Sequence, residues 1–272
     1  MSLPPPGPVV LGIVNVTPDS FSDGGRYLDP AAAVRRAEVL MAEGADMVDI
    51  GGESTRPGAD RPSVDEELRR VVPVVEAVAE SVPVSIDTRS EEVARAAVAA
   101  GASIINDISA ELGPLAAELG VGWIATHMQG DPATMQDAPR YDDVVDEVCA
   151  FLDHRASAAA ALGVERLWID PGFGFGKSLQ HNVQLLAKID RVVATGWPVA
   201  VGTSRKSMIG RLIADSDGVE QPVPVDDRLV GSVATATYAL ACGAELLRVH
   251  DVKAARQAVS VVTGRSPSQS RS

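Results

Sequence analysis

The chain has 272 residues and a formal net charge of −13 at pH 7, with 46% hydrophobic and 4% aromatic residues. This length suits one α/β barrel, whose usual size is about 250 residues. An acidic surface disfavours nucleic acid or an anionic membrane as a partner, so an anion site would need locally gathered positive charge.

Eight short β-branched runs alternate with longer helical patterns along the chain. Most of these runs are almost continuously apolar, as expected for parallel strands that are covered on both faces. In chain order the predicted strands are 9–14, 46–50, 82–86, 103–108, 121–126, 166–169, 198–201 and 245–249.

Helix ends are marked by capping residues and glycines. Ser63 and Glu66 predict a capping box ahead of a helix that contains Pro73, which we expect to kink it. Ser90 is a predicted N-cap of the next helix. Six glycines each follow a helical pattern and precede a strand, where a left-handed residue ends a helix well. They are Gly44, Gly101, Gly120, Gly163, Gly196 and Gly243.

Eight such units predict a single-domain (β/α)8 TIM barrel over residues 9–263. Residues 1–8 are expected to be a flexible N-terminal segment, and the polar stretch 264–272 a disordered tail. An open doubly wound sheet is the alternative, but no GxGxxG follows the first strand to support it.

Several features favour a cytoplasmic protein that does not insert in a membrane. Cys149 and Cys242 lie outside any CxxC or metal-ligand pattern, and we expect both to be buried thiols in a reducing compartment. The Pro-rich start lacks the pattern of a signal peptide. No apolar run reaches the roughly 20 residues of a membrane span.

Two long loops follow the first two strands, at 15–25 and 51–58. Both exceed the usual two to six residues of a βα connection. Ordinary turns rich in Gly, Pro, Ser and Asp are the alternative. Long loops over the carboxyl end of a barrel more often bind or cover a ligand.

Carboxylates and an amide follow three other strands, at Asp87, at Asn106 with Asp107, and at Asp170. Because active sites of these barrels lie at the carboxyl ends of the strands, these side chains should meet at one mouth. They could bind a metal or a planar ligand rich in N–H donors, such as an aminopyrimidinone ring. A helix N-cap role remains open for any one of them.

Positive charge gathers after the last two strands. Arg205 and Lys206 precede a short helical pattern at 208–212, and Arg248 and His250 end the eighth strand. This is the usual anion site of such barrels, and a helix N-terminus adds N–H donors. A solvated pair on a surface helix is the alternative for Arg205 and Lys206.

Other chemistry finds little support. His127 is expected to be a satisfied core or rim histidine, and His154 and His181 are assigned no role. No Ser-His-Asp triad, activated Cys or metal cluster is visible in the sequence. The residues therefore predict a barrel that binds an anionic heterocycle and acts by positioning and charge stabilisation.

A set of ordered motifs extends this interpretation. NVTPDSFSDGG, GGESTRPG, SIDT, IIND, HMQG, DPGFGFGK, SRKSMIG and RVHDV together resemble bacterial dihydropteroate synthase, from about Leu11 to Val262. The resemblance implies a transferase of folate biosynthesis, usually a homodimer. It would join 6-hydroxymethyl-7,8-dihydropterin pyrophosphate to p-aminobenzoate, giving 7,8-dihydropteroate and pyrophosphate.

The resemblance also implies roles for individual residues. The pterin would be held by Asp87, Asn106, Asp170, Lys206 and Arg248, with Met128 lining its pocket. The pyrophosphate would be bound by Asn15, Arg248 and His250, and Asn15 would contact the Mg2+ that it carries. The aminobenzoate would meet Thr55, Arg56, Pro57, Phe175 and Ser207. The catalytic set would be Asp87, Lys206, Arg248 and Asn15.

In the implied SN1-like chemistry pyrophosphate leaves first, a carboxylate such as Asp87 stabilises the methylene cation, and the closed loops exclude water. Two other functions remain open: a pterin-binding methyltransferase barrel and an inactive paralogue. The first has no reason to carry GGESTRPG or SRKS, and the second should have lost its mouth loops. The stretch 109–120 is shorter than the family pattern and 214–224 is longer, which affects local loop shape.

Overall fold

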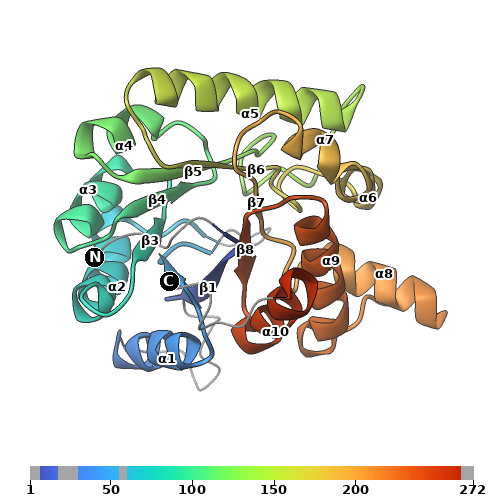
Figure 1. Ribbon diagram of the computed structural model, residues 1–272, viewed down its shortest axis with the longest axis horizontal. Coiled ribbons are helices and arrows are strands. Elements are labelled where there is room, and N and C mark those ends of the chain that lie inside the picture. Colours follow the sequence, from blue (N-terminus) through green and yellow to red (C-terminus); the bar gives the residue numbers. More distant parts are fainter. Residues whose placement is uncertain (1–6, 18–29, 55–59, 265–272) are drawn as a thin grey trace.

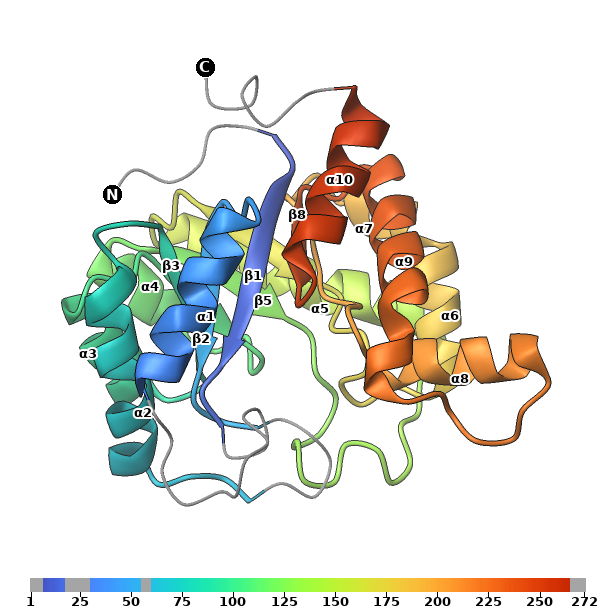
Figure 2. The ribbon, with the colours of Figure 1, turned by 90° about the horizontal axis from the view of Figure 1, so that it is seen from below.

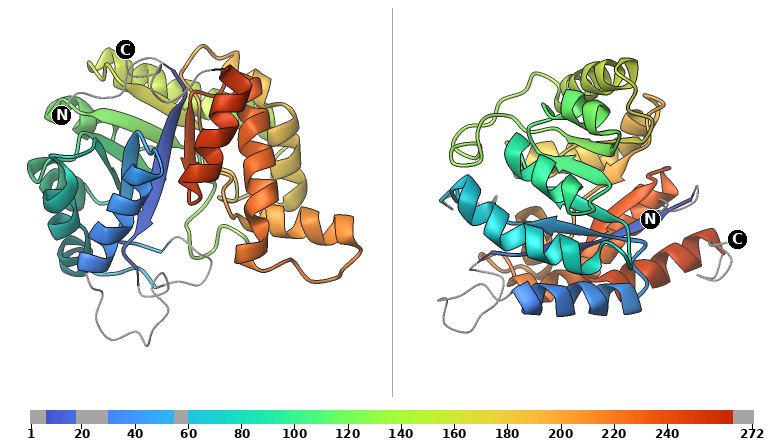
Figure 3. Two further views of the ribbon diagram at one scale, coloured as in Figure 1. Left: turned by 60° about the horizontal axis from the view of Figure 1, so that its bottom comes forward. Right: turned by 90° about the vertical axis from the view of Figure 1, so that its left-hand side faces the viewer.

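The computed structural model describes residues 7–17, 30–54 and 60–264. Eight parallel strands form one sheet in the order β6-β5-β4-β3-β2-β1-β8-β7, and a bridge between Ile169 and Val199 joins its two edges. The helices lie outside this nearly closed ring of strands (Figure 1; further views in Figure 3). The predicted TIM barrel is therefore confirmed.

All eight predicted strands are present, with bounds that differ by one or two residues. They are β1 Val9–Asn15, β2 Met47–Gly51, β3 Val84–Asp87, β4 Ile104–Asp107, β5 Gly122–Thr126, β6 Leu167–Asp170, β7 Ala200–Val201 and β8 Leu246–Val249. Residues 1–6 and 265–272, in the two ends predicted to be flexible, lie outside the described residues.

Helices separate the strands, as the alternating pattern predicts. They are α1 Pro30–Ala42, α2 Val64–Val78, α3 Glu91–Ala99, α4 Gly113–Leu119, α5 Val144–Ala161, α6 Leu179–Ala187, α7 Ile189–Val193, α8 Ser207–Asp217, α9 Leu229–Ala241 and α10 Val252–Thr263. A 3-10 turn, η2 Val225–Arg228, precedes α9. The helix predicted at 208–212 is longer than expected, because it continues to a left-handed Gly218.

Most of the helix-end predictions are confirmed. Ser63 and Ser90 cap α2 and α3 through their side chains, and all six glycines have positive φ. The reciprocal half of the predicted capping box is wrong, because the Glu66 carboxylate pairs with two arginines of its own helix instead. A full capping box occurs at α6, where Ser178 pairs with His181, a residue that the sequence left without a role.

The core has two parts. A large cluster lies between the strands and the helices, and a smaller one fills the inside of the barrel. The inner cluster contains Val9, Leu11, Met47, Ile104, Ile124, Trp168, Ala200 and Leu246. Because side chains alternate along a strand, the next inward position of each strand lies two residues further on. Those positions carry the candidate site.

The two cysteines lie on outer helices. Cys149 on α5 and Cys242 at the end of α9 are half-buried rather than buried, because these outer helices are covered on one side only. Within the described ranges, no helix is both long and apolar enough to cross a membrane.

Candidate functional site

A polar layer lies above the inner core at the carboxyl ends of the strands, which face the lower edge of Figure 2. It is built by the two-residue repeat: in β2, β4, β6 and β8 an apolar inward residue is followed by a polar one on the same face. The pairs are Met47 and Asp49, Ile104 and Asn106, Trp168 and Asp170, and Leu246 and Arg248. Asn15, Gly51, Asp87 and Asn106 also stand in one register across β1 to β4.

Arg248 connects this layer. Its Nε donates to Asp49 Oδ2 at 2.6 Å, and its Nη2 donates to Asp87 Oδ2. Asn106 Nδ2 donates to the same Asp49 oxygen at 3.0 Å. Asp49 is fully buried, so it supports both side chains from below. Asp49 was not among the predicted site residues, although a carboxylate two residues after Met47 in a buried strand was the available signal.

The charges of this network depend on burial. Burial raises the pKa of Asp87 to about 7, with Asp49 adding to the effect and Arg248 opposing it. Burial would lower the pKa of Arg248, but Asp49 and Asp87 outweigh it and raise that pKa. Arg248 therefore stays a cation, while Asp87 titrates close to neutral pH.

Asp170 and Lys206 form a second part of the mouth. Asp170 Oδ1 accepts a hydrogen bond from the Gly172 N–H at 2.7 Å. Lys206 Nζ donates to the Phe173 carbonyl and lies 4.0 Å from the centre of the Phe175 ring. Burial raises the pKa of Asp170, and burial lowers that of Lys206 to about 8. The predicted pterin and aminobenzoate residues are thus neighbours.

The loop 171–177 is held from beneath by Lys177, which is only 2% exposed. Lys177 Nζ lies 2.8 Å from His127 Nδ1 and donates to the carbonyls of Gly172 and Phe175 at 3.0 and 3.1 Å. Burial lowers the pKa of Lys177 well below its usual value and that of His127 to about 3. His127 is therefore a satisfied buried histidine, and Lys177 is a supporting residue that the sequence did not single out.

Glycine is required where this loop turns. Gly172 has φ +67°, and a Cβ there would lie 1.8 Å from the His127 carbonyl oxygen. The positive φ of Gly172 turns the backbone back on itself. The Phe173 carbonyl can therefore face Lys206 while the Gly172 carbonyl faces Lys177.

Two residues of the predicted anion region, Arg205 and His250, are held by neighbouring side chains. Arg205 forms a two-point ion pair with Asp251, at 2.9 and 2.6 Å, so its guanidinium is engaged inside the protein. His250 is held through its ring and backbone by Ser204. Burial, with Arg248 and Arg205 nearby, lowers the pKa of His250 to about 3. The ring is therefore neutral.

Three other predicted site residues lie at the ends of strands or at the start of a helix. Asn15 ends β1, Met128 is half-buried after β5, and Ser207 is the exposed first residue of α8. Ser207 stands at a helix N-terminus without a side-chain cap, as the aminobenzoate prediction requires. Thr55, Arg56 and Pro57 lie outside the described residues.

The prediction that Asp107 faces the mouth is wrong. Its two oxygens accept hydrogen bonds from the backbone N–H groups of Ser109, Glu111 and Leu112. Successive strand residues point to opposite faces, so Asp107 faces outward while Asn106 faces the mouth. Asp107 therefore orders the start of the loop to α4 and does not face a ligand.

Ion pairs join the loops around the mouth. Arg89, just after β3, donates to Glu53 at 2.7 and 3.2 Å and to Asp131 at 3.1 Å. Glu53 follows β2 and Asp131 follows β5. One arginine thus connects three loops on the same side of the barrel.

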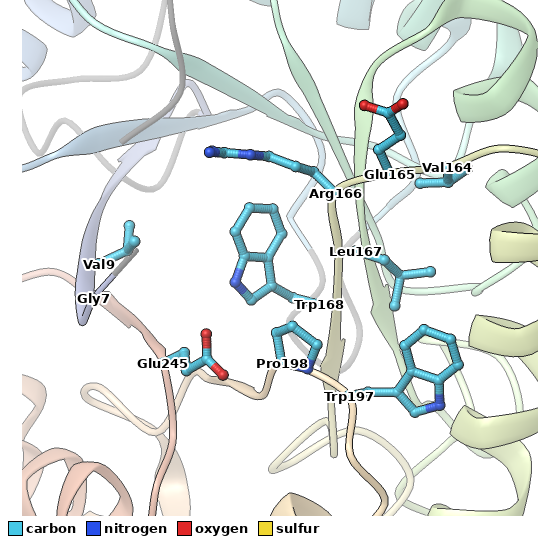
Figure 4. A pocket seen from close by; sticks show the side chains of 10 residues that line it. All are labelled: Gly7, Val9, Val164, Glu165, Arg166, Leu167, Trp168, Trp197, Pro198 and Glu245. Atoms are coloured by element: carbon cyan, nitrogen blue, oxygen red, sulfur yellow. The ribbon is translucent and has the colours of Figure 1, made fainter. Parts of the chain in front are cut away.

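A cavity of about 230 Å³ lies at the opposite end of the barrel, where the strands begin. Trp168 and Trp197 line it beside the carboxylates of Glu165 and Glu245 (Figure 4). None of the candidate site residues lines this cavity. The cavity is therefore separate from the candidate site at the carboxyl ends of the strands.

Within the described part of the chain, no group of three or more His, Cys, Asp and Glu side chains could hold a metal. Asn15 contributes a single amide oxygen at the strand end. Mg2+ is commonly held by one or two protein oxygens together with substrate phosphates. One amide oxygen at this position fits an ion that is held mainly by phosphate oxygens.

Comparisons with known proteins agree with this geometry. The family model described as pterin binding enzyme matches residues 11–250. Dihydropteroate synthase of Escherichia coli (strain K12) is 48% identical over 94% of this chain and 90% of its own length. The chain also resembles two solved dihydropteroate synthases. One, from Yersinia pestis in a sulfonamide drug complex, has TM-score 0.86 and 44% identity, with 95% of this chain and 94% of that one covered.

The second, from Xanthomonas albilineans with 4-aminobenzoic acid, has TM-score 0.84 and 52% identity, with 95% and 93% covered. These likenesses extend over nearly the whole barrel, including every strand that contributes to the polar layer. The chain therefore belongs to the dihydropteroate synthase family of pterin-binding enzymes.

Proposed function

We propose that this barrel condenses 6-hydroxymethyl-7,8-dihydropterin pyrophosphate with p-aminobenzoate, giving 7,8-dihydropteroate and pyrophosphate. The observation that carries the proposal is the position of Arg248. Its guanidinium is fixed by Asp49 and Asp87 on the carboxylate side of the mouth, and its charge also acts on His250. A heterocycle joined to an anion would span these two sides.

The carboxylates and amide would hold the pterin. Asp170 offers an oxygen to the amidine-like edge of the ring, where two parallel N–H groups suit a carboxylate. Asn106 and Lys206 supply further polar contacts, and Met128 an apolar one. Asp170 and Lys206 attract each other electrostatically. Neither charge is therefore isolated when the ring covers it and excludes water.

The cationic side would hold the leaving group. Arg248 supplies a permanent positive charge, and His250 and Asn15 supply neutral contacts to the pyrophosphate. Mg2+ would enter with the pyrophosphate as part of the substrate and meet Asn15. Bound there, it would neutralise negative charge on the departing oxygens.

The chemical step follows from these positions. The bond between the pterin methylene carbon and the ester oxygen breaks, and the electron pair leaves with pyrophosphate. Asp87, when ionised, lowers the energy of the resulting cation more than bulk water would. The amine nitrogen of p-aminobenzoate then forms the new bond and loses a proton. Loops after β1 and β2, partly outside the described residues, would exclude water that could capture the cation.

Inhibition kinetics test the aminobenzoate site. The relative from Xanthomonas albilineans was solved with 4-aminobenzoic acid and the one from Yersinia pestis with a sulfonamide. Phe175, Ser207 and the segment 55–57 would form the same site here. A sulfonamide should therefore raise the KM for p-aminobenzoate and leave kcat unchanged. Purely noncompetitive inhibition would contradict this position of the site.

The dependence of activity on pH follows from Asp87 and Lys206. The pKa of Asp87 is about 7, so kcat/KM should fall below that pH as the carboxylate protonates. The pKa of Lys206 is about 8, so kcat/KM should also fall above that pH as the ammonium is lost. We expect a narrow bell-shaped profile. In Lys206→Arg the alkaline limb should disappear from the residual activity; a flat profile between pH 6 and 9 in the parent would contradict both roles.

A homodimer is also part of the proposal. On α9, Val230 is 79% exposed, and Leu229 and Tyr238 are 41% and 45% exposed. Large apolar side chains exposed on one helix favour association. Sedimentation should give a dimer, and Val230→Glu should give a monomer; a monomeric parent would contradict the proposed dimer.

We place the protein in the cytoplasm, because its two free thiols suit a reducing compartment.

A further inference from the structure

Ser204 lies between β7 and α8 and is 5% exposed. Its hydroxyl contacts one residue of the proposed pyrophosphate site in two ways. The His250 backbone N–H donates to Ser204 Oγ at 3.1 Å, and the same Oγ lies 3.1 Å from Nδ1 of the His250 ring. Arg36, on α1, fixes the same backbone by donating to the His250 carbonyl at 2.7 Å.

These contacts decide which ring nitrogen carries the proton. Ser204 Oγ accepts from the backbone N–H of His250 and has a lone pair left for a second donor, but its single proton is buried and needs an acceptor. Among the described residues, the other polar partner of this hydroxyl is His250 Nδ1. The Ser204 O–H therefore donates to Nδ1. A neutral imidazole that accepts at Nδ1 carries its proton on Nε2.

The protonation state of the ring supports this assignment. Burial, followed by the charges of Arg248 and Arg205, lowers the pKa of His250 to about 3. The ring is neutral at physiological pH, so it has two tautomers, which carry the proton on Nδ1 or on Nε2. One presents an N–H donor there, and the other presents a lone pair that would repel a phosphate oxygen.

We propose that Ser204 is a positioning residue that fixes His250 in its Nε2–H tautomer, so that the ring can donate a hydrogen bond to the leaving pyrophosphate. This inference rests on the proposed function, in which His250 binds that anion. It assigns Ser204 a role that depends on its hydroxyl proton and not on its size.

Imidazole nitrogen NMR of the whole protein reads the tautomer directly. His250→Gln identifies the signals of that ring among the four histidines. In the parent protein we expect a pyridine-type shift for Nδ1 and a pyrrole-type shift for Nε2. Ser204→Ala should move both shifts toward those of mixed tautomers, and Ser204→Thr, which keeps a hydroxyl, should preserve them.

A matched control separates this role from general loss of packing. Ser232 is also 5% exposed, and its hydroxyl contacts the same loop through the Arg205 N–H at 2.9 Å. Ser232→Ala should therefore leave the His250 shifts unchanged. Unchanged His250 shifts in Ser204→Ala would overturn the inference.

Binding of inorganic pyrophosphate with Mg2+, measured by calorimetry, connects the tautomer to function. Loss of a hydrogen bond to a charged group corresponds to roughly 10-fold or more in affinity, so Ser204→Ala should weaken binding by at least that factor. Ser204→Thr should restore it. Equal affinity in Ser204→Ala and the parent would overturn the inference. A parent protein with the expected tautomer but no pyrophosphate binding would instead overturn the proposed function.

Discussion

Asp170→Asn should weaken pterin binding strongly without weakening the fold. The substitution removes a buried charge that would pair with the N–H edge of the ring. Truncating one partner of a buried charged hydrogen bond typically reduces binding free energy by about 2–5 kcal/mol. Calorimetry with 6-hydroxymethyl-7,8-dihydropterin pyrophosphate should therefore show an affinity loss of roughly 30-fold or more.

Stability should respond differently from binding. The amide oxygen of Asn can still accept the Gly172 N–H, which lies 2.7 Å from Asp170 Oδ1. Burial raises the pKa of Asp170, which means that the folded state disfavours its ionised form. The free energy of unfolding near neutral pH should therefore not fall. Asp153→Asn, on the exposed face of α5, is the control and should change neither the pterin affinity nor the free energy of unfolding. Unchanged affinity in Asp170→Asn would contradict the proposed contact between Asp170 and the pterin.

Asp49→Ala should reduce both stability and turnover. Asp49 is fully buried and accepts from Arg248 Nε at 2.6 Å and Asn106 Nδ2 at 3.0 Å. Without it, Arg248 Nε and the Asn106 amide each lose an acceptor, and among the described residues Arg248 keeps only its contact with Asp87. Breaking a buried ion pair in this way typically lowers the free energy of unfolding by about 3–5 kcal/mol. Denaturant unfolding and turnover per folded molecule measure the two effects.

A second buried ion pair provides the control. Asp46 accepts from Arg256 and from the Val10 N–H, at 2.8 Å for the latter, close to the other end of the barrel. Asp46→Ala should also lower stability but leave turnover per folded molecule unchanged. Parent-like turnover in Asp49→Ala would show that Arg248 does not depend on this support.

The barrel could be predicted from sequence because its signals are local. Buried β-branched runs mark the strands, and each glycine that ends a helix requires only its own backbone conformation. The residues at strand ends followed from the general rule that such barrels bind ligands there. Asp87, Asn106, Asp170 and Arg248 accordingly lie in one polar layer.

The residues that support this layer were harder to predict. Asp49 lies inside its strand, one inward step from the core residue Met47, and an analysis of strand ends alone passes over it. Asp107 shares a strand end with Asn106 but faces the other way, which the two-residue alternation would have indicated. Lys177 and Ser204 act through a folded-back loop and a backbone N–H, which depend on tertiary structure that no local pattern encodes.

A turnover assay with purified protein, dihydropterin pyrophosphate, p-aminobenzoate and Mg2+, read by mass spectrometry, tests the proposed reaction directly. We expect dihydropteroate and pyrophosphate in equal amounts when all components are present, and none with Lys206→Ala. If the parent protein binds the pterin pyrophosphate but forms no dihydropteroate, the proposed reaction is contradicted, and the barrel is a pterin-binding protein without this synthase activity.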